Sequence, residues 1–220
     1  MLLQNLINYE FLKRILTGIS LSIVIFWSLL FYPKVFSLII FLVLFLILKI
    51  EWPLLCPKYI KNSVYYYLFT LLYIILPFLL IIYLEFYNYF LNFYLFISVF
   101  SHDTFSYIFG KLFGRSKLLP KVSPNKTIEG AIGGFVGVSL ISYLFFQFNI
   151  FKENFIFLFI ISLLITVTAL LGDLFESYLK RLSDIKDSGS ILPGHGGLLD
   201  RFDSILFNVY LIYFFKDYLM

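Results

Sequence analysis

The chain has 220 residues, of which 61% are hydrophobic and 14% are charged, and its formal net charge is +4. A mean hydropathy of +0.93 excludes a water-soluble globular protein and predicts an integral membrane protein, with no separate soluble domain and no nucleic-acid partner. Cys56 is the single cysteine, which excludes an intrachain disulfide and a cysteine-rich metal site.

Apolar segments follow one another along the whole chain, and most have the roughly 20 residues that a membrane-spanning helix needs. They cover residues 15–32, 35–48, 64–84, 88–109, 128–148, 155–175 and 204–219. No small-residue cleavage site follows the first segment, so we expect it to be retained. The second segment is short and fits either a span or half of a re-entrant hairpin. The sequence therefore predicts one all-α domain over residues 1–220, a polytopic membrane helical bundle of about seven transmembrane helices.

The basic residues predict how these helices are oriented. If the N-terminus is cytoplasmic and all the segments span, every lysine and arginine except Lys34, Lys152 and Lys216 faces the cytoplasm, in line with the positive-inside tendency. The two large polar loops, residues 110–127 and 180–203, then lie on that same side, because two spans separate them. Closely spaced glycines at the start of the span 128–148 predict a close helix–helix contact.

Residues 172–203 hold an unusual group of charges between two apolar segments. If the preceding helix continues, its 100° rotation per residue gathers several polar side chains on one face. These side chains are Asp173, Glu176, Ser177, Lys180 and Arg181. Gly196 and Gly197 follow in a turn that lets backbone approach a ligand closely. Carboxylates, cations and a glycine turn beside a membrane indicate a site for a metal ion and phosphate groups.

Residues 101–130 form a second polar stretch. Thr127 is predicted to cap the helix that follows it, and Lys126 adds a cation at the positive end of that helix. Such a helix start is a plausible cradle for a triphosphate. Asp103 lies near the end of an apolar span, where an acid is a candidate site residue.

Both stretches lie within residues 101–203. They resemble motifs of the phosphatidate cytidylyltransferases, which are also called CDP-diacylglycerol synthases. Residues 177–203 read SYLKRLSDIKDSGSILPGHGGLLDRFD and are similar to that family's signature at every fixed position. The runs DTFSYIFGKLFG (103–114) and KVSPNKTIEG (121–130) are similar to a second motif of the same family. The resemblance implies transfer of CMP from CTP to phosphatidate, which gives CDP-diacylglycerol and pyrophosphate.

The resemblance and the chemistry of the residues together suggest roles. Asp173 and Asp200 are the expected metal ligands, and Glu176 and Asp203 are further candidate ligands or ion-pair partners. The expected catalytic groups, which neutralise phosphate charge or donate to pyrophosphate, are Lys180, Arg181, Lys186, His195 and Arg201. The expected substrate-binding residues are Asp103, Lys121, Ser123, Lys126, Thr127, Ser177, Gly196 and Gly197.

The expected cofactor is Mg²⁺, and the resemblance alone implies a second, monovalent cation such as K⁺. The expected partners are CTP, phosphatidate and the lipid bilayer, and a homodimer is compatible with the resemblance. The expected location is the inner (cytoplasmic) membrane, with the active loops facing the cytoplasm.

Other classes of membrane protein are less favoured. A polyprenol kinase or an archaeal-type lipid cytidylyltransferase would use similar acids and CTP, but the match over residues 177–203 argues against both. A transporter or channel would carry polar groups through the bilayer centre, whereas here they gather on two loops. A CDP-alcohol phosphotransferase would need an acid-rich motif that the sequence lacks.

Overall fold

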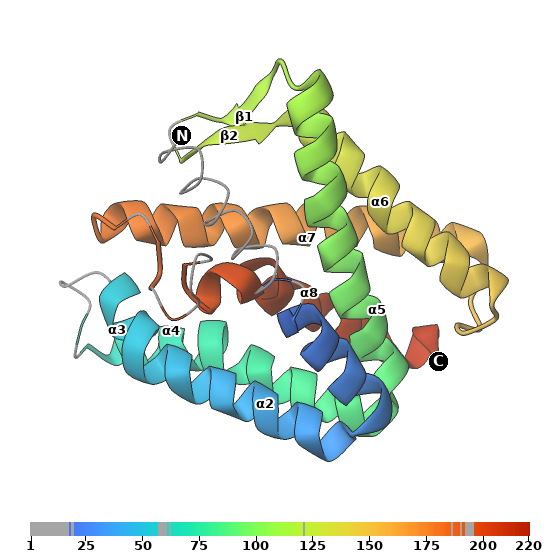
Figure 1. The fold of residues 1–220 in the computed structure, drawn as a ribbon, viewed down its shortest axis with the longest axis horizontal. Coiled ribbons are helices and arrows are strands. Elements are labelled where there is room, and N and C mark those ends of the chain that lie inside the picture. The colour runs from blue at the N-terminus through green and yellow to red at the C-terminus, as the bar shows by residue number, and fades with distance from the viewer. Residues whose placement is uncertain are drawn as a thin grey trace, which may run out of the picture.

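The computed structural model describes residues 18, 20–56, 61, 63–120, 122–185, 187–189, 191 and 196–220. Helices dominate these residues, which confirms the predicted all-α membrane bundle (Figure 1). In chain order the elements are a helix over Ser20–Phe31, α2 (Pro33–Leu46), the π-helical turn η1 (Ile47–Glu51), α3 (Trp52–Leu55), α4 (Val64–Thr70), the π-helical turn η2 (Leu71–Ile75), α5 (Leu76–Phe113), β1 (Lys117–Leu119), β2 (Ser123–Thr127), α6 (Ile128–Gln147), α7 (Phe155–Leu182) and α8 (Leu199–Leu219).

The helices are built for a lipid environment. Within the described residues, four helical stretches are long and apolar enough to cross a membrane: Pro33–Leu55, Val64–Phe113, Ile128–Gln147 and Phe155–Leu182. Many large apolar side chains on them are exposed, as lipid-facing residues are in a membrane protein. The protein is therefore an integral membrane protein. The helix Ser20–Phe31 is shorter, and α8 is not among the four, so the count of about seven spans stays a prediction.

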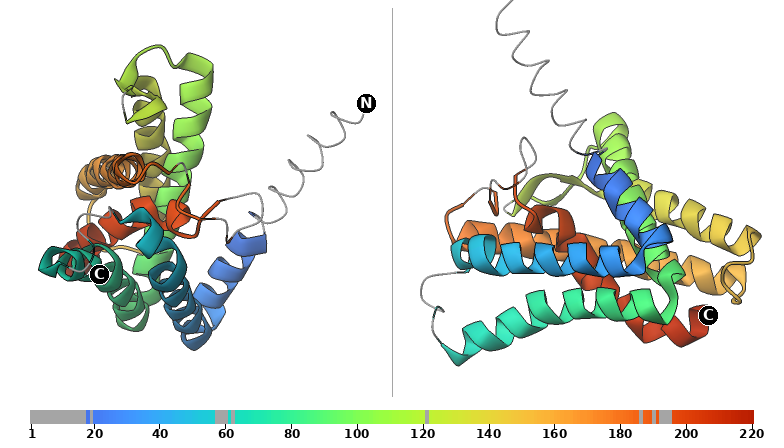
Figure 2. Two further views of the ribbon diagram at one scale, coloured as in Figure 1. Left: turned by 90° about the vertical axis from the view of Figure 1, so that its left-hand side faces the viewer. Right: turned by 60° about the horizontal axis from the view of Figure 1, so that its bottom comes forward.

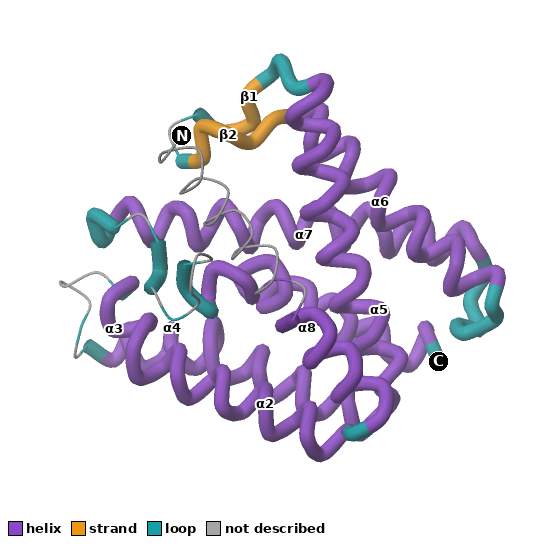
Figure 3. The backbone as a smooth tube through the Cα atoms, in the orientation of Figure 1, coloured by secondary structure: helices purple, strands orange, loops and turns teal. Residues whose placement is uncertain are grey.

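The 50-residue stretch Val64–Phe113 is divided at Asn88, whose backbone is extended (φ −163°, ψ 113°). The Asn88 side-chain oxygen accepts a hydrogen bond of 3.0 Å from the Phe90 N–H and so starts the second half as a separate helix. The chain bends sharply between the two halves, and the second half rises from the end of the first (Figures 1 and 3). The two halves correspond to the apolar segments predicted at residues 64–84 and 88–109.

The second half of α5 packs tightly along α6, because α6 presents glycines to it. A Cβ atom placed on Gly137 would lie 2.8 Å from the Phe105 ring, and one on Gly130 would lie 2.9 Å from the carbonyl oxygen of Ser106. The predicted close contact is thus confirmed, and larger side chains at these positions would push the two helices apart.

The helix α8 lies between α5 and α7 in its contacts. This helix packs against both α7 and α5, and α6 packs against α7. Figures 1 and 2 show α2 running beside the first half of α5. The interior is rich in fully buried aromatic side chains, among them Trp52, Tyr94 and Phe96.

A short antiparallel β-hairpin, which the sequence analysis did not predict, joins α5 to α6. Lys117 pairs with Thr127, and Leu119 pairs with Ser123. Pro124 is tolerated in β2 because a two-stranded sheet has only edge strands, where a missing N–H need not break a ladder. The hairpin brings Ser123, Lys126 and Thr127 to the start of α6.

Candidate active site

The polar face predicted for residues 173–181 exists on α7. Side chains three and four residues apart lie over one another on a helix, and here they bond to one another. The Ser177 hydroxyl lies 3.4 Å from an Asp173 oxygen as donor, and the Lys180 ammonium lies 3.2 Å from a Glu176 oxygen. The C-terminal part of the apolar helix α7 thereby carries two carboxyl groups, of Asp173 and Glu176, and the ammonium group of Lys180.

Lys126 connects the two polar stretches. Its ammonium forms an ion pair with a carboxylate oxygen of Asp173, so that β2 and α7 meet through opposite charges. The side chains are 19% and 35% exposed, which places the pair at the edge of the protein interior. Next to it, the Thr127 hydroxyl accepts a hydrogen bond of 3.1 Å from the Gly130 N–H, which confirms that Thr127 caps α6.

Asp200, in the first turn of α8, collects donors from three places. The Lys180 ammonium lies 2.9 Å from its Oδ1, the Gly197 N–H donates to its Oδ2 over 3.0 Å, and the Ser188 N–H lies 3.2 and 3.3 Å from the two oxygens. Burial alone would raise the pKa of Asp200, but the charge of Lys180 and these donors together lower it. Asp200 is therefore an ionised carboxylate that ties α7, α8 and the connecting segment together.

These groups surround one cavity of about 720 Å³. The predicted site residues that line it are Asp103, Ser123, Lys126, Thr127, Asp173, Lys180, Asp200, Arg201 and Asp203. They come from α5, β2, α7 and α8. Two stretches that are separated in sequence by α6 and most of α7 therefore converge at one place. Cations and carboxylates both line this cavity, whose volume is large enough for the phosphates of a nucleotide.

The other predicted residues fall outside this lining or outside the described part of the chain. Glu176, Ser177 and Gly197 contact lining residues through the hydrogen bonds given above. A Cβ atom on Gly196, whose φ is +81°, would lie 3.0 Å from an Asp200 oxygen. Arg181 is exposed and lies outside the lining. Lys121, Lys186 and His195 lie outside the described residues.

The carboxylates of the site are suited to a cation that arrives with a substrate. Burial, and then the nearby charges of Asp173 and Asp103, raise the pKa of Asp203. Glu176 is 0% exposed, and its Oε1 has no hydrogen-bond partner in the described structure. No three histidine, cysteine or acidic side chains among the described residues form a ready metal cage. Carboxylate oxygens are ligands that Mg²⁺ accepts one or two at a time, with phosphates and water completing its shell.

Glu51, from the N-terminal half of the chain, contacts the start of α8 next to the cavity, and the sequence analysis did not single it out. It is 0% exposed, and its two oxygens accept hydrogen bonds of 2.7 Å from the N–H groups of Leu198 and Leu199. A signal was present in the sequence, since an acid flanked by apolar residues near a membrane is seldom without a role.

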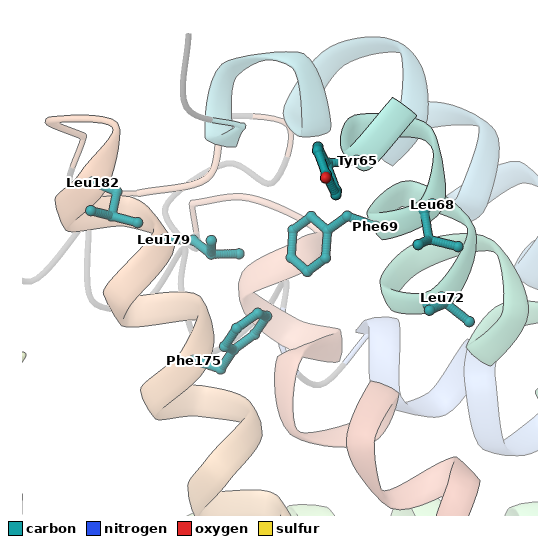
Figure 4. A pocket seen from close by; sticks show the side chains of 7 residues that line it. All are labelled: Tyr65, Leu68, Phe69, Leu72, Phe175, Leu179 and Leu182. Atoms are coloured by element: carbon teal, nitrogen blue, oxygen red, sulfur yellow. The ribbon is translucent and has the colours of Figure 1, made fainter. Parts of the chain in front are cut away.

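A second cavity, of about 390 Å³, lies on the α4 side of α7. Figure 4 shows Phe69 of α4 pointing toward Phe175 and Leu179 of α7. No predicted site residue lines this apolar cavity. The helix α7 therefore presents charged groups to one cavity and apolar side chains to another.

Comparison with known proteins adds an independent line of evidence. A model of the cytidylyltransferase family matches residues 11–219. The chain is 49% identical to a phosphatidate cytidylyltransferase of Bacillus subtilis over 114 residues, which are 52% of this chain and 42% of that protein. It is 47% identical to the Rickettsia conorii protein of that name over 125 residues, 54% of each chain, and 50% identical to the Staphylococcus haemolyticus one over 105 residues, 48% of this chain and 40% of that one. The aligned residues thus span about half the length of these relatives.

Proposed function

The chain belongs to the cytidylyltransferase family, and from that premise we propose that it transfers CMP from CTP to phosphatidate, giving CDP-diacylglycerol and pyrophosphate. The observation that carries this proposal is the meeting of the two polar stretches at one cavity, through the ion pair of Lys126 with Asp173 and the contacts of Lys180 with Asp200. The names of the relatives from Bacillus subtilis and Rickettsia conorii support the same reaction.

In this reaction a phosphate oxygen of phosphatidate forms a bond to the α-phosphorus of CTP. The bond from that phosphorus to the bridging oxygen of the β-phosphate breaks, and pyrophosphate leaves with the electron pair. The nucleophile is already an anion, so the site needs no strong base and works by positioning and by neutralising charge. A cavity that places several cations beside carboxylates suits those two tasks.

Residues in different parts of the site are proposed to bind phosphate oxygens and to neutralise phosphate charge. The start of α6, with Thr127, Lys126 and Ser123, is proposed to hold phosphate oxygens by its cations, hydroxyls and free N–H groups. Further phosphate charge is neutralised by Lys180, Arg181 and Arg201, together with Lys121, Lys186 and His195 from outside the described residues.

Mg²⁺ is proposed to be held by Asp173 and Asp200 together with the triphosphate, where it would neutralise and orient the phosphates. Asp173 pairs with Lys126, and the arriving phosphates can take over this cation. Each Asp200 oxygen already receives donors from Lys180, Ser188 or Gly197, so its service as a ligand requires some of these bonds to be exchanged. A monovalent cation and a homodimer complete the proposal, as does an inner-membrane location with the site facing the cytoplasm.

The position of the label in CTP tests the proposal directly. Purified protein is given phosphatidate, Mg²⁺ and CTP labelled either at the α- or at the γ-phosphate. A cytidylyltransferase moves the α-label into lipid and releases the γ-label as pyrophosphate, whereas a lipid kinase moves the γ-label into lipid. Each component is omitted in turn, and polyprenol and an archaeal ether-lipid phosphate replace phosphatidate in parallel reactions. Lipid labelled only from γ-CTP, or only with another acceptor, would refute the proposal.

A further inference from the structure

We propose that Glu51 is a positioning residue for the active site: its buried carboxylate holds the start of α8 and thereby sets where Asp200 stands. This inference rests on the proposed function for its meaning in turnover, although its structural part can be tested alone. Glu51 ends the π-helical turn η1, and its partners Leu198 and Leu199 lie 147 and 148 residues further along the chain.

The start of α8 has no cap of its own. The residue at its N-cap is Leu198, which has no side-chain oxygen to accept the free N–H groups of the first turn. Glu51 supplies both acceptors from another helix, one oxygen to Leu198 N–H and the other to Leu199 N–H, each over 2.7 Å. Its negative charge also lies at the positive end of α8, where an anion is stabilised.

The carboxylate depends on this interaction in return. A buried charge is costly unless hydrogen bonds or an opposite charge compensate it. Among the described residues, Glu51 accepts hydrogen bonds from the two backbone N–H groups and from the Ser188 hydroxyl, which lies 3.4 Å away. Glu51 and the segment before α8 therefore stabilise each other.

Glu51 and Asp200 both accept hydrogen bonds from residues that precede α8. Ser188 donates its N–H to Asp200, and its hydroxyl lies 3.4 Å from Glu51. Gly197 donates its N–H to Asp200, and the next residue, Leu198, donates to Glu51. The two carboxylates therefore both bond to the backbone or side chains of Ser188 and of the pair Gly197–Leu198.

The same contact explains Gly189, because a Cβ atom there would lie 2.8 Å from Glu51 Oε1. A Cβ atom on Gly197 would lie 1.9 Å from the Ser188 hydroxyl oxygen and 3.0 Å from Glu51 Oε1. Only a residue without a side chain lets the backbone come this close to the carboxylate.

The position of Glu51 itself is fixed by its neighbours. Trp52, which is fully buried, donates its ring N–H to the Thr70 hydroxyl over 2.7 Å. The Ser183 hydroxyl at the end of α7 donates to the Leu55 carbonyl over 2.6 Å. The stretch that carries Glu51 is thus fastened both to α4 and to α7, which lets it transmit a fixed position to α8.

Two substitutions distinguish the acceptor capacity of the Glu51 carboxylate from the size of its side chain. Glu51→Gln keeps the size but replaces one acceptor oxygen by an NH₂ group, which must face one of the backbone N–H donors. Glu51→Asp keeps the carboxylate but is one methylene shorter. If acceptor capacity matters, the turnover number falls at least about ten-fold in Glu51→Gln and less in Glu51→Asp. If only packing mattered, the glutamine variant would be the more active of the two, and that order would overturn the proposal.

Residue-resolved hydrogen exchange gives the readout that does not depend on activity. The N–H groups of Leu198 and Leu199 have no acceptor inside α8, so their protection reports on Glu51. In Glu51→Gln we expect their exchange to become roughly ten-fold faster, while that of the capped Gly130 N–H at the start of α6 stays the same. Unchanged protection of Leu198 and Leu199 would show that Glu51 does not hold α8.

The matched control is Glu85→Gln, which alters another buried acid that lies outside the cavity lining. It should leave both the exchange of Leu198 and the turnover number near wild-type values. If wild-type protein shows no CTP turnover with phosphatidate, the proposed function fails, and the exchange data still decide whether Glu51 holds α8. Faster exchange with unchanged turnover would remove Glu51 from the positioning of the active site.

Discussion

Replacing Asp173 by asparagine tests whether the ion pair between the two polar stretches serves chemistry or only folding. The substitution removes the charge that pairs with Lys126 and keeps the size of the side chain. The pair is neither fully exposed nor fully buried, so its loss should lower the free energy of unfolding by about 1–2 kcal/mol, between the values for surface and buried pairs. Since stabilities are typically about 5–15 kcal/mol, nearly all of the variant should remain folded.

Turnover should fall far more than stability does. If Asp173 holds Mg²⁺ and positions the triphosphate, Asp173→Asn should reduce CTP-dependent labelling of lipid by about 10²-fold or more. Unfolding of the size estimated above cannot produce that loss. The double variant with Lys126→Met removes the cation left without its partner, so its stability should return toward the wild-type value while its activity stays lost. Wild-type turnover by folded Asp173→Asn would refute the assignment.

Further predictions address the neighbouring groups. Thr127→Ala should lower stability by about 1 kcal/mol and raise the KM for CTP, because the buried Gly130 N–H loses its acceptor, and Thr127→Ser should restore both. Asp200→Asn should abolish turnover without preventing membrane insertion, as judged by labelled lipid and by detergent extraction. Chelation of divalent cations should stop turnover, and Mg²⁺ but not K⁺ alone should restore it. Lys152→Ala, in the segment between α6 and α7, should be nearly silent in every assay.

Much of the fold could be predicted because the relevant signals are local. Apolar runs of sufficient length marked the helices, and the spacing of Asp173, Glu176 and Lys180 placed them on one face of α7. Thr127 could be recognised as a cap because capping depends on a residue and the three that follow it. These features require no knowledge of which helices are neighbours.

The features that could not be predicted depend on tertiary neighbours. Nothing in the sequence specifies that Lys126 would meet Asp173, since the two residues lie in separate stretches and were expected to bind substrate and metal, not each other. Glu51 is the clearest case, because its partners are the N–H groups of Leu198 and Leu199, which carry no side-chain signal. The kink at Asn88 was visible only as a gap between two apolar runs.

The placement of Glu51 changes which parts of the chain belong to the active site. The family motifs lie within residues 101–203, and the sequence indicates only membrane anchoring for the apolar helices before them. Yet the α8 turn that carries Asp200 and Arg201 begins on a carboxylate from η1, and the end of α7 is bonded to the backbone of α3. The geometry of the cavity is therefore set jointly by the motif-bearing helices and by the N-terminal ones. Substitutions around residues 51–55 should accordingly alter turnover without touching a substrate.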